Sequence, residues 1–319
     1  MKIATVTLNP AIDQTVRVDH FRPNTVNRGL GMQFDAGGKG VNVASFLVDA
    51  GYSVVATGFL GQDNDNIFKR FFARKGIKDR FVYIPGSTRI GIKIVDEAQQ
   101  QTTDINQYGL APSGDAMHAL LQVIDELAAS YDWFALSGAL PPGVPSSTYA
   151  AIITKLKERG KKVSLDTSGE ALQQGVLAGA TIVKPNIDEL QQLVDASLSS
   201  EDEIEQAAHR LLNYGTQIVV VSMGKQGAMF IDAQETLVAT PPAISVKSTV
   251  GAGDAMIAGL IVGQILELEL SECARLATAF SLEAISHVGA YLSSPEVLRE
   301  HSQLVSIRPL TPSSRSLYP

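Results

Sequence analysis

The sequence has little cysteine and no long apolar segment, and both shortages exclude classes of protein. Cys273 is the only cysteine, so the chain has neither an intrachain disulfide framework nor a cysteine-ligated zinc cluster. The apolar stretch over residues 255–266 is too short for a transmembrane helix, which needs about 20 residues. We expect the first residues to form a short strand and not a signal peptide. We therefore expect a soluble, cytoplasmic protein with no membrane partner.

Basic residues are also fewer than acidic ones: the chain has 26 Lys and Arg residues and 33 Asp and Glu residues, which gives a net charge of −7. An acidic chain argues against nucleic acid as a partner. It does not exclude an anionic small molecule, since a few local cations are enough for one phosphate. The chain of 319 residues, 45% of them hydrophobic, is long enough for one large α/β domain or two smaller ones.

Strand and helix patterns alternate along most of the chain, which predicts an α/β fold with a mainly parallel sheet and helices on both faces. Two all-strand patches, 14–36 and 88–106, interrupt this alternation and predict a small separate β-sheet, possibly a lid. We expect a single domain over residues 1–310 and a frayed tail over 311–319. The predicted helices cover 41–50, 64–75, 114–129, 147–159, 169–178, 187–195, 201–214 and 271–287, with one more from Asp254, another after Pro295 and a hairpin over 227–240.

A glycine-framed turn, residues 249–254 (TVGAGD), leads into an apolar segment that predicts a buried helix starting near Asp254. The first N–H groups of a helix lack intrahelical partners and form its positive end. Gly251, Ala252 and Gly253 carry little bulk, so a phosphate could approach these groups. A carboxylate at this place suits a base that takes the proton of a hydroxyl beside a phosphoryl group. The structural alternative is an aspartate that caps the helix.

A second glycine-rich turn, residues 35–42 (DAGGKGVN), precedes a helix but matches neither the Walker nor the Rossmann pattern. Its backbone N–H groups, the Lys39 cation and the Asn42 amide suit a polyhydroxy or phosphorylated small molecule. Asp13 follows the first strand, where a carboxylate can accept two sugar hydroxyls. The alternatives are ordinary turns, with Lys39 solvated.

Further polar residues follow predicted strands, and ligands of open α/β sheets bind at the carboxyl ends of the strands. Asn186 and Glu189 suit a water-mediated Mg²⁺–nucleotide contact, although the same spacing also fits a helix capping box. The glycines after Ser222 leave room for a base or phosphates, or form a hairpin turn. The residues that share this position at strand ends are Asn9, Asp13, Ser137, Asp166, Lys184, Asn186, Glu189, Ser222 and Gly224.

Together these motifs resemble the pfkB (ribokinase-like) family of sugar kinases. Residues 35–42 and 248–255 are similar to its two signatures, and the segments between them occur in the order the family shows: 7–13, 137–143, 184–189 and 222–224. The resemblance runs from about residue 2 to 290 and is strongest to the phosphosugar branch of the family.

The resemblance implies a ribokinase-like three-layer sandwich with a β lid, and a homodimer formed through that lid. It implies ATP- and Mg²⁺-dependent phosphorylation of a phosphosugar hydroxyl, most closely fructose 1-phosphate to fructose 1,6-bisphosphate. Asp254 would be the general base, and Gly251, Ala252 and Gly253 the anion hole. The other implied contacts are Asp13, Gly37, Gly38, Lys39, Asn42, Arg89, Arg28 and Ser137 for the sugar phosphate, Lys184, Asn186, Ser222, Gly224, Gly227 and Thr249 for ATP, and Glu189 for Mg²⁺ through water.

Three alternatives stay open on the sequence. The nearest is the same chemistry on tagatose 6-phosphate, fructose 6-phosphate or an unphosphorylated sugar. A non-catalytic sugar-phosphate-binding protein is the second, although a binder has no use for the base at Asp254. The third, a nucleotide-dependent oxidoreductase, lacks the Gly-x-Gly-x-x-Gly turn after the first strand.

Overall fold

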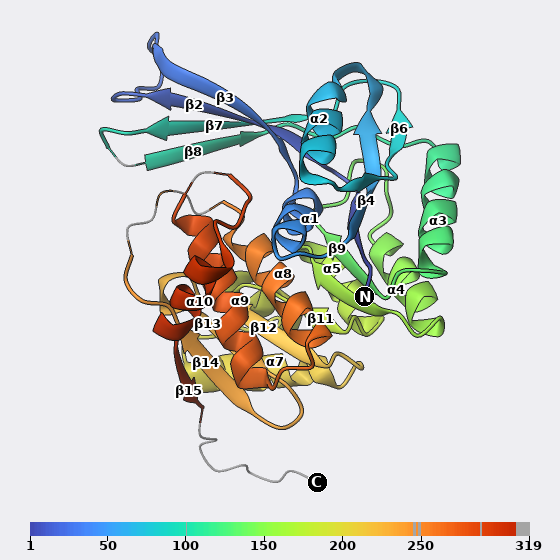
Figure 1. Cartoon of the computed structure of the whole chain (residues 1–319), viewed down its shortest axis with the longest axis vertical. Coiled ribbons are helices and arrows are strands. Elements are labelled where there is room, and N and C mark those ends of the chain that lie inside the picture. The colour runs from blue at the N-terminus through green and yellow to red at the C-terminus, as the bar shows by residue number, and fades with distance from the viewer. Residues whose placement is uncertain (100, 245–246, 248–249, 288, 311–319) are drawn as a thin grey trace.

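A long central sheet runs through the molecule, with helices on both of its faces (Figure 1). The computed structural model describes residues 1–99, 101–244, 247, 250–287 and 289–310, so the expected tail at 311–319 lies outside the described residues. The strand order is β15-β14-β13-β12-β11-β10-β9-β1-β4-β5, with β6 also paired to β4. The strands are β1 (Ile3–Thr7), β4 (Val54–Gly61), β5 (Lys78–Asp79), β6 (Val82–Ile84), β9 (Trp133–Ser137), β10 (Lys162–Asp166), β11 (Ile182–Val183), β12 (Ile218–Ser222), β13 (Ala228–Ile231), β14 (Thr236–Thr240) and β15 (Ser306–Pro309).

Pairing is parallel from β5 through β12 and antiparallel from β12 to β15, which confirms the expected mainly parallel sheet. The hairpin expected over 227–240 forms as β13 and β14. The edge strands β5 and β15 were not expected from the sequence. β5 has only two residues, too few for a recognisable strand pattern. β15 ends in a proline, a residue that argues against a strand when the sequence is considered alone.

Two hydrophobic layers cover the sheet because successive residues of each buried strand point to opposite faces. One layer is formed by α1 (Lys39–Asp49), α2 (Asn66–Lys75), α8 (Ala252–Ile265), α9 (Leu270–Ile285) and α10 (Pro295–Leu304). The other is formed by α3 (Gly114–Ala128), α4 (Thr148–Glu158), α5 (Gly169–Leu177), α6 (Ile187–Val194) and α7 (Glu201–Leu212). The two layers and the sheet make the expected three-layer sandwich.

Helix α8 is buried along its length, as its apolar sequence requires, with every residue from Asp254 to Gly263 buried. It begins at Ala252, two residues earlier than the sequence indicated, and Gly251 occupies the N-cap position in a left-handed conformation with φ of 83°. None of the helices in the described residues is long and apolar enough to cross a bilayer.

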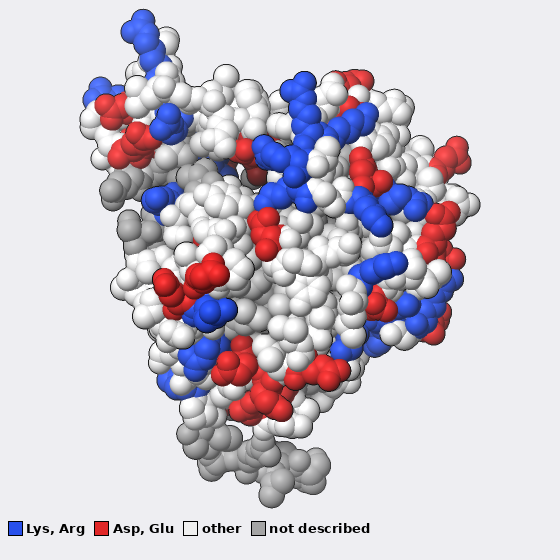
Figure 2. All heavy atoms as spheres, in the orientation of Figure 1, with Lys and Arg blue, Asp and Glu red and all other residues white. Residues whose placement is uncertain are grey.

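A separate four-stranded sheet projects from the body of the molecule, at the upper left of Figure 1. Its strands are β3 (Gly29–Gly37), β2 (Ala11–Val18), β7 (Ile90–Asp96) and β8 (Gln101–Asn106), in that spatial order. The two all-strand patches therefore form one sheet, as expected, and we refer to it as the lid sheet. Figure 2 shows acidic and basic side chains distributed together over one face of the whole molecule.

Candidate active site

A cavity of about 360 Å³ lies where the lid sheet meets the carboxyl ends of the central strands. It is large enough for a small phosphorylated molecule. Its walls come from the lid, the first turn of α1, the ends of β10 and β11 and the N-terminus of α8. The lining residues are Ala11, Asp13, Gly38, Lys39, Asn42, Arg89, Asp166, Lys184, Val250, Gly251, Gly253 and Asp254.

Asp254 is the third residue of α8, and only 6% of its surface is exposed. Its Oδ2 accepts a 2.8 Å hydrogen bond from Nδ2 of Asn42, a residue 212 positions earlier in the chain. Gly251 caps the helix, so the alternative that Asp254 is an N-cap is wrong. Burial raises the pKa of Asp254 to about 6, assisted by the nearby Asp166 carboxylate and opposed by Lys39 and the Asn42 hydrogen bond. A carboxylate with this pKa can accept a proton near neutral pH.

Asp166 holds two lysines beside this carboxylate. It ends β10, is 2% exposed, and its Oδ1 lies 3.0 Å from Nζ of Lys39 while its Oδ2 lies 3.5 Å from Nζ of Lys184. Burial alone would raise the pKa of Asp166, but the two ammonium groups lower it below its usual value. Lys39 is therefore ion-paired with a buried carboxylate, while 42% of its side chain is exposed.

Asp166 was recognised in the sequence only as one of several polar residues at strand ends, and no role was assigned to it. Nothing near Asp166 in the sequence indicates that Lys39, 127 residues away, is its partner. The only signal that could have identified it was its position as an acidic residue at the end of a strand adjacent to other candidates.

Glycines at two predicted positions make room for charged groups. A Cβ atom on Gly37 would lie 2.3 Å from Oδ2 of Asp13, so this glycine accommodates the Asp13 carboxylate directly. A Cβ atom on Gly253 would lie 3.0 Å from Nζ of Lys184. The Lys184 ammonium therefore lies against the N-terminus of α8, where it adds positive charge to the helix dipole.

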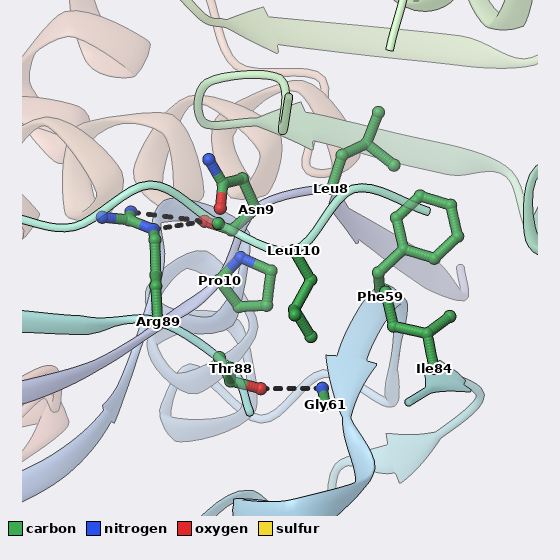
Figure 3. Close-up of a pocket in the computed structure, with 10 residues that line it drawn as sticks. Leu8, Asn9, Pro10, Phe59, Gly61, Ile84, Thr88, Arg89 and Leu110 are labelled. Atoms are coloured by element: carbon green, nitrogen blue, oxygen red, sulfur yellow. Dashed lines mark hydrogen bonds between the residues drawn. The ribbon is translucent and has the colours of Figure 1, made fainter. Parts of the chain in front are cut away.

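Arg89 lies at the junction between the lid and the central sheet, beside a small pocket (Figure 3). Its Nε and Nη2 donate to the backbone carbonyl of Asn9 at 3.4 and 3.3 Å, and Nη1 donates to Oδ1 of Asn106 at 3.5 Å. The Thr88 hydroxyl accepts a hydrogen bond from the Gly61 backbone at 2.8 Å on the same junction. These contacts hold the guanidinium at the wall of the cavity, beside Asp13.

The described residues that the sequence predicts to contact ATP lie at and after the carboxyl ends of the adjoining strands β11 and β12. Asn186 and Ser222 form an isolated parallel bridge, and the Ser222 N–H donates to the Pro185 carbonyl. Gly224 and Gly227 follow in a short 3-10 turn, and a Cβ atom on Gly227 would lie 1.9 Å from the Ala239 carbonyl oxygen, so the fold itself requires this glycine. Of this set, Lys184 lines the cavity.

Glu189 forms the capping box that the sequence also allowed. Its Oε2 accepts from the Asn186 N–H at 2.9 Å, and the Asn186 side chain accepts from the Glu189 N–H at 2.8 Å. The Glu189 charge nevertheless acts on the cavity. Burial lowers the pKa of the Lys39 ammonium, but the charges of Asp166, Asp254 and, to a smaller extent, Glu189 raise it above its usual value. The described residues contain no cluster of three or more His, Cys, Asp or Glu side chains with metal-site geometry.

Several predicted residues within the described part of the chain are not among those lining the cavity: Arg28, Gly37, Ser137, Asn186, Glu189, Ser222, Gly224, Gly227 and Ala252. Ser137 is buried at the end of β9, paired in register with Asp166, and its hydroxyl has no hydrogen-bond partner within the described part of the chain. Arg28 is exposed directly before β3. Thr249 lies outside the described residues.

Comparison with known proteins identifies the family. The model of the pfkB family carbohydrate kinases matches residues 6–297, so the chain belongs to this family of phosphotransferases, whose acceptor is a hydroxyl group of a sugar. It is 45% identical to a 1-phosphofructokinase of Rhodobacter capsulatus over 98% of this chain and 99% of that protein. It is 39% identical to a 1-phosphofructokinase of Xanthomonas campestris over 96% and 98%, respectively.

Solved structures agree with this assignment. The phosphofructokinase-2 of Escherichia coli in complex with substrates and products has a TM-score of 0.88 at 28% identity, covering 95% of this chain and 99% of that one. A possible 1-phosphofructokinase of Thermotoga maritima has a TM-score of 0.89 at 25% identity, covering 98% and 100%. The protein is a sugar-phosphate kinase with the ribokinase-like fold.

Proposed function

We propose that the protein transfers the γ-phosphoryl group of ATP to the 6-hydroxyl of fructose 1-phosphate, forming fructose 1,6-bisphosphate. The observation that carries this proposal is the buried Asp254 carboxylate, with its pKa raised to about 6, at the N-terminus of α8 and near two lysines. The choice of substrate is supported by relatives named 1-phosphofructokinase at up to 45% identity over nearly the whole chain.

In the proposed reaction Asp254 takes the proton of the sugar hydroxyl as the oxygen attacks the γ-phosphorus. A new O–P bond forms, the bond from the γ-phosphorus to the bridging oxygen breaks, and ADP leaves. The N–H groups of Gly251, Ala252 and Gly253 face the charge that develops on the transferring group, because the first N–H groups of α8 have no intrahelical partner. Lys39 and Lys184 add positive charge at the same end of the cavity.

ATP would lie along Lys184, Asn186, Ser222, Gly224, Gly227 and Thr249, beside the transfer end of the cavity. The residues present fit Mg²⁺ held mainly by water: Glu189 has one carboxylate oxygen in the capping box, and its charge acts on Lys39 in the cavity. Mg²⁺ keeps several waters and needs few protein ligands. When bound, the ion would neutralise charge on the phosphates. Asp13, Gly37, Gly38, Asn42 and Ser137 would contact the sugar.

An ADP-release assay with Mg-ATP tests the proposal directly. Fructose 1-phosphate, fructose 6-phosphate and tagatose 6-phosphate are compared at equal concentrations, with unphosphorylated fructose as a fourth acceptor. We expect the highest kcat/KM with fructose 1-phosphate. A higher value with either 6-phosphate would assign the protein to that substrate, and binding of these sugars without turnover would support the non-catalytic alternative.

The sequence predicts that Arg89 and Lys39 bind the phosphate that the substrate already carries. We propose this role for Arg89, and we propose that Lys39 acts at the transfer end of the cavity, because Asp166 holds it beside Asp254. Arg89→Ala should raise the KM for the phosphosugar by about tenfold or more while leaving the KM for ATP within twofold, because one charge-assisted contact is lost. Lys39→Ala should mainly lower kcat, since the Lys39 charge acts on Asp254. Steady-state kinetics with each substrate varied in turn measures both effects. Equal changes in the two KM values would contradict the assignment.

We also propose a homodimer formed through the apolar face of the lid sheet. One row across its four strands contains Phe34, Gln14, Ile92 and Ile105, and the next contains Met32, Val16 and Ile94. Phe34 is 47% exposed, and Leu30, Met32 and Ile105 are exposed by 49% to 61%. A second copy would bury this surface, and E. coli phosphofructokinase-2, a structural neighbour, has a form described as tetrameric.

Sedimentation velocity measures this assembly. The wild type is expected to sediment as a dimer of about 68 kDa, twice the 34.0 kDa chain, and Phe34→Asp as a monomer, because a charge would be buried in an apolar contact. Leu177→Asp is the matched control, since Leu177 is 54% exposed at the end of α5, away from the lid sheet. A wild-type monomer, or equal dissociation by both variants, would exclude this interface.

A further inference from the structure

The lid sheet has a polar face as well as an apolar one, and Asp13 is the residue of that face that lines the cavity. Strand register places Asp13 beside Gly91 on β7, which pairs in turn with Asn106 on β8. A Cβ atom on Gly91 would lie 3.3 Å from both Oδ1 of Asp13 and Oδ1 of Asn106, so these side chains share one face. Lys93 lies two residues beyond Gly91 on β7, and therefore on the same face.

The charge of Lys93 acts on the carboxylate of Asp13, which lines the cavity. Burial raises the pKa of the Asp13 carboxyl, and among the charged neighbours that lower it Lys93 contributes the largest effect, ahead of Arg89. The Asp13 carboxylate is therefore influenced by two cations, of which Arg89 lines the cavity with it. Lys93 faces Asp104 across the β7–β8 pair, but no ion pair within 4.0 Å joins it to another residue in the described part of the chain. Its ammonium group remains available to a ligand.

The cations of the site therefore fall into two groups. Lys39 and Lys184 are held by Asp166 beside Asp254, at the end where the phosphoryl group is transferred. Arg89 and Lys93 flank Asp13, on the lid side. In fructose 1-phosphate the accepting 6-hydroxyl and the phosphate lie at opposite ends of the sugar. With the hydroxyl at Asp254 and Asp13 on the sugar hydroxyls, the phosphate extends toward the second group.

We infer that Lys93 binds the phosphate group that the sugar substrate already carries, and thereby selects phosphorylated over unphosphorylated sugars. The inference rests on the proposed function and names a residue of the lid for its substrate specificity. Arg89 presents a fixed planar fork because the Asn9 carbonyl and Asn106 hold it. Lys93 adds a flexible point charge on the polar face of the same sheet, and two cations suit a phosphate dianion.

The test compares Lys93→Met with wild type, using steady-state kinetics on fructose 1-phosphate, fructose and ATP. We expect the KM for fructose 1-phosphate to rise about tenfold or more, with kcat and the KM for ATP within twofold. The preference for fructose 1-phosphate over fructose should fall by the same factor. Lys93→Arg, which keeps the charge, should restore most of the affinity. Calorimetric titration with fructose 1-phosphate in the absence of ATP should show the same loss.

Arg17→Met is the matched control, because Arg17 lies on the same face of the lid sheet but is paired with Glu97 and is not among the main charges that act on Asp13. It removes the same charge and should leave the KM for fructose 1-phosphate within twofold. An equal effect of both variants, or an equal effect of Lys93→Met on fructose and fructose 1-phosphate, would overturn the inference. The wild-type acceptor profile tests the proposed function separately: if another phosphosugar is preferred, the Lys93 comparison is made with that sugar.

Discussion

Asp254→Asn is expected to lower kcat by at least about 100-fold while leaving the affinity for ATP unchanged. Asparagine keeps the shape of the side chain and can still accept the hydrogen bond from Asn42, but it cannot take a proton. Loss of a general base costs roughly 10²- to 10⁴-fold in rate. Turnover within tenfold of wild type, with normal ATP binding by calorimetry, would exclude Asp254 as the base.

The pH dependence of the wild type provides a second test of the same residue. Because the pKa of Asp254 is raised to about 6, the carboxylate is protonated and inactive below this pH and becomes available above it. The value of kcat/KM should therefore rise through about pH 6 and level off near pH 7. The pH dependence of kcat/KM reports the pKa of the base in the free enzyme. Asp49→Asn is the control for effects unrelated to Asp254. Asp49 pairs with Lys75 and does not line the cavity, so this variant should have the same pH profile of kcat/KM as wild type.

Asp254→Asn should also be more stable than wild type at pH 8. The pKa of Asp254 in the folded protein lies above the usual 3.8, so its stabilising contribution is fully present below pH 3.8 and is lost as the pH rises through 6. Ionising this buried group at pH 8 costs on the order of 3 kcal/mol, which asparagine avoids. Urea unfolding at pH 8 and pH 4 should show a difference that shrinks toward pH 4.

Asp166→Asn is expected to have the second-largest effect, on stability and on catalysis together. The change leaves the buried Lys184 without its carboxylate, and breaking a buried pair costs about 3–5 kcal/mol. We also expect kcat/KM to fall at least about tenfold, because Lys39 and Lys184 lose the group that holds them in place. Since Asp166 raises the pKa of Asp254, its removal should move the acid limb of the pH profile to lower pH.

This shift distinguishes a positioning role from a purely structural one. Asp49→Asn removes another carboxylate–lysine pair, between Asp49 and Lys75, and should lower stability without moving the pH profile. In a Lys184→Met background the stability cost of Asp166→Asn should shrink, because the buried cation is already absent. An unchanged profile with an unchanged free energy of unfolding would show that Asp166 does not organise the site.

The sequence predicted most of the architecture because the relevant signals are local. The alternation of strands and helices gave the layers, and the two all-strand patches gave the lid sheet. Asp254 was identified because a glycine-rich turn directly precedes it and an apolar helical segment directly follows it. The Asn42–Asp254 hydrogen bond and the Asp166 ion pairs join residues far apart in the chain, so no local pattern could predict them. The short strands β5 and β15 depend on the neighbouring strands that they join.

The strand order also has a consequence for how the chain folds as it is synthesised. β4 joins one side of β1 and β9 the other, and β10 through β15 each pair with the strand immediately before them along the chain. Every new strand therefore joins a free edge of the sheet, and no existing pair has to open to admit it. The sheet can grow in the order in which the ribosome delivers it. Helix α8 emerges after β14, so a nascent chain has most of its sheet before it acquires Asp254, the proposed base.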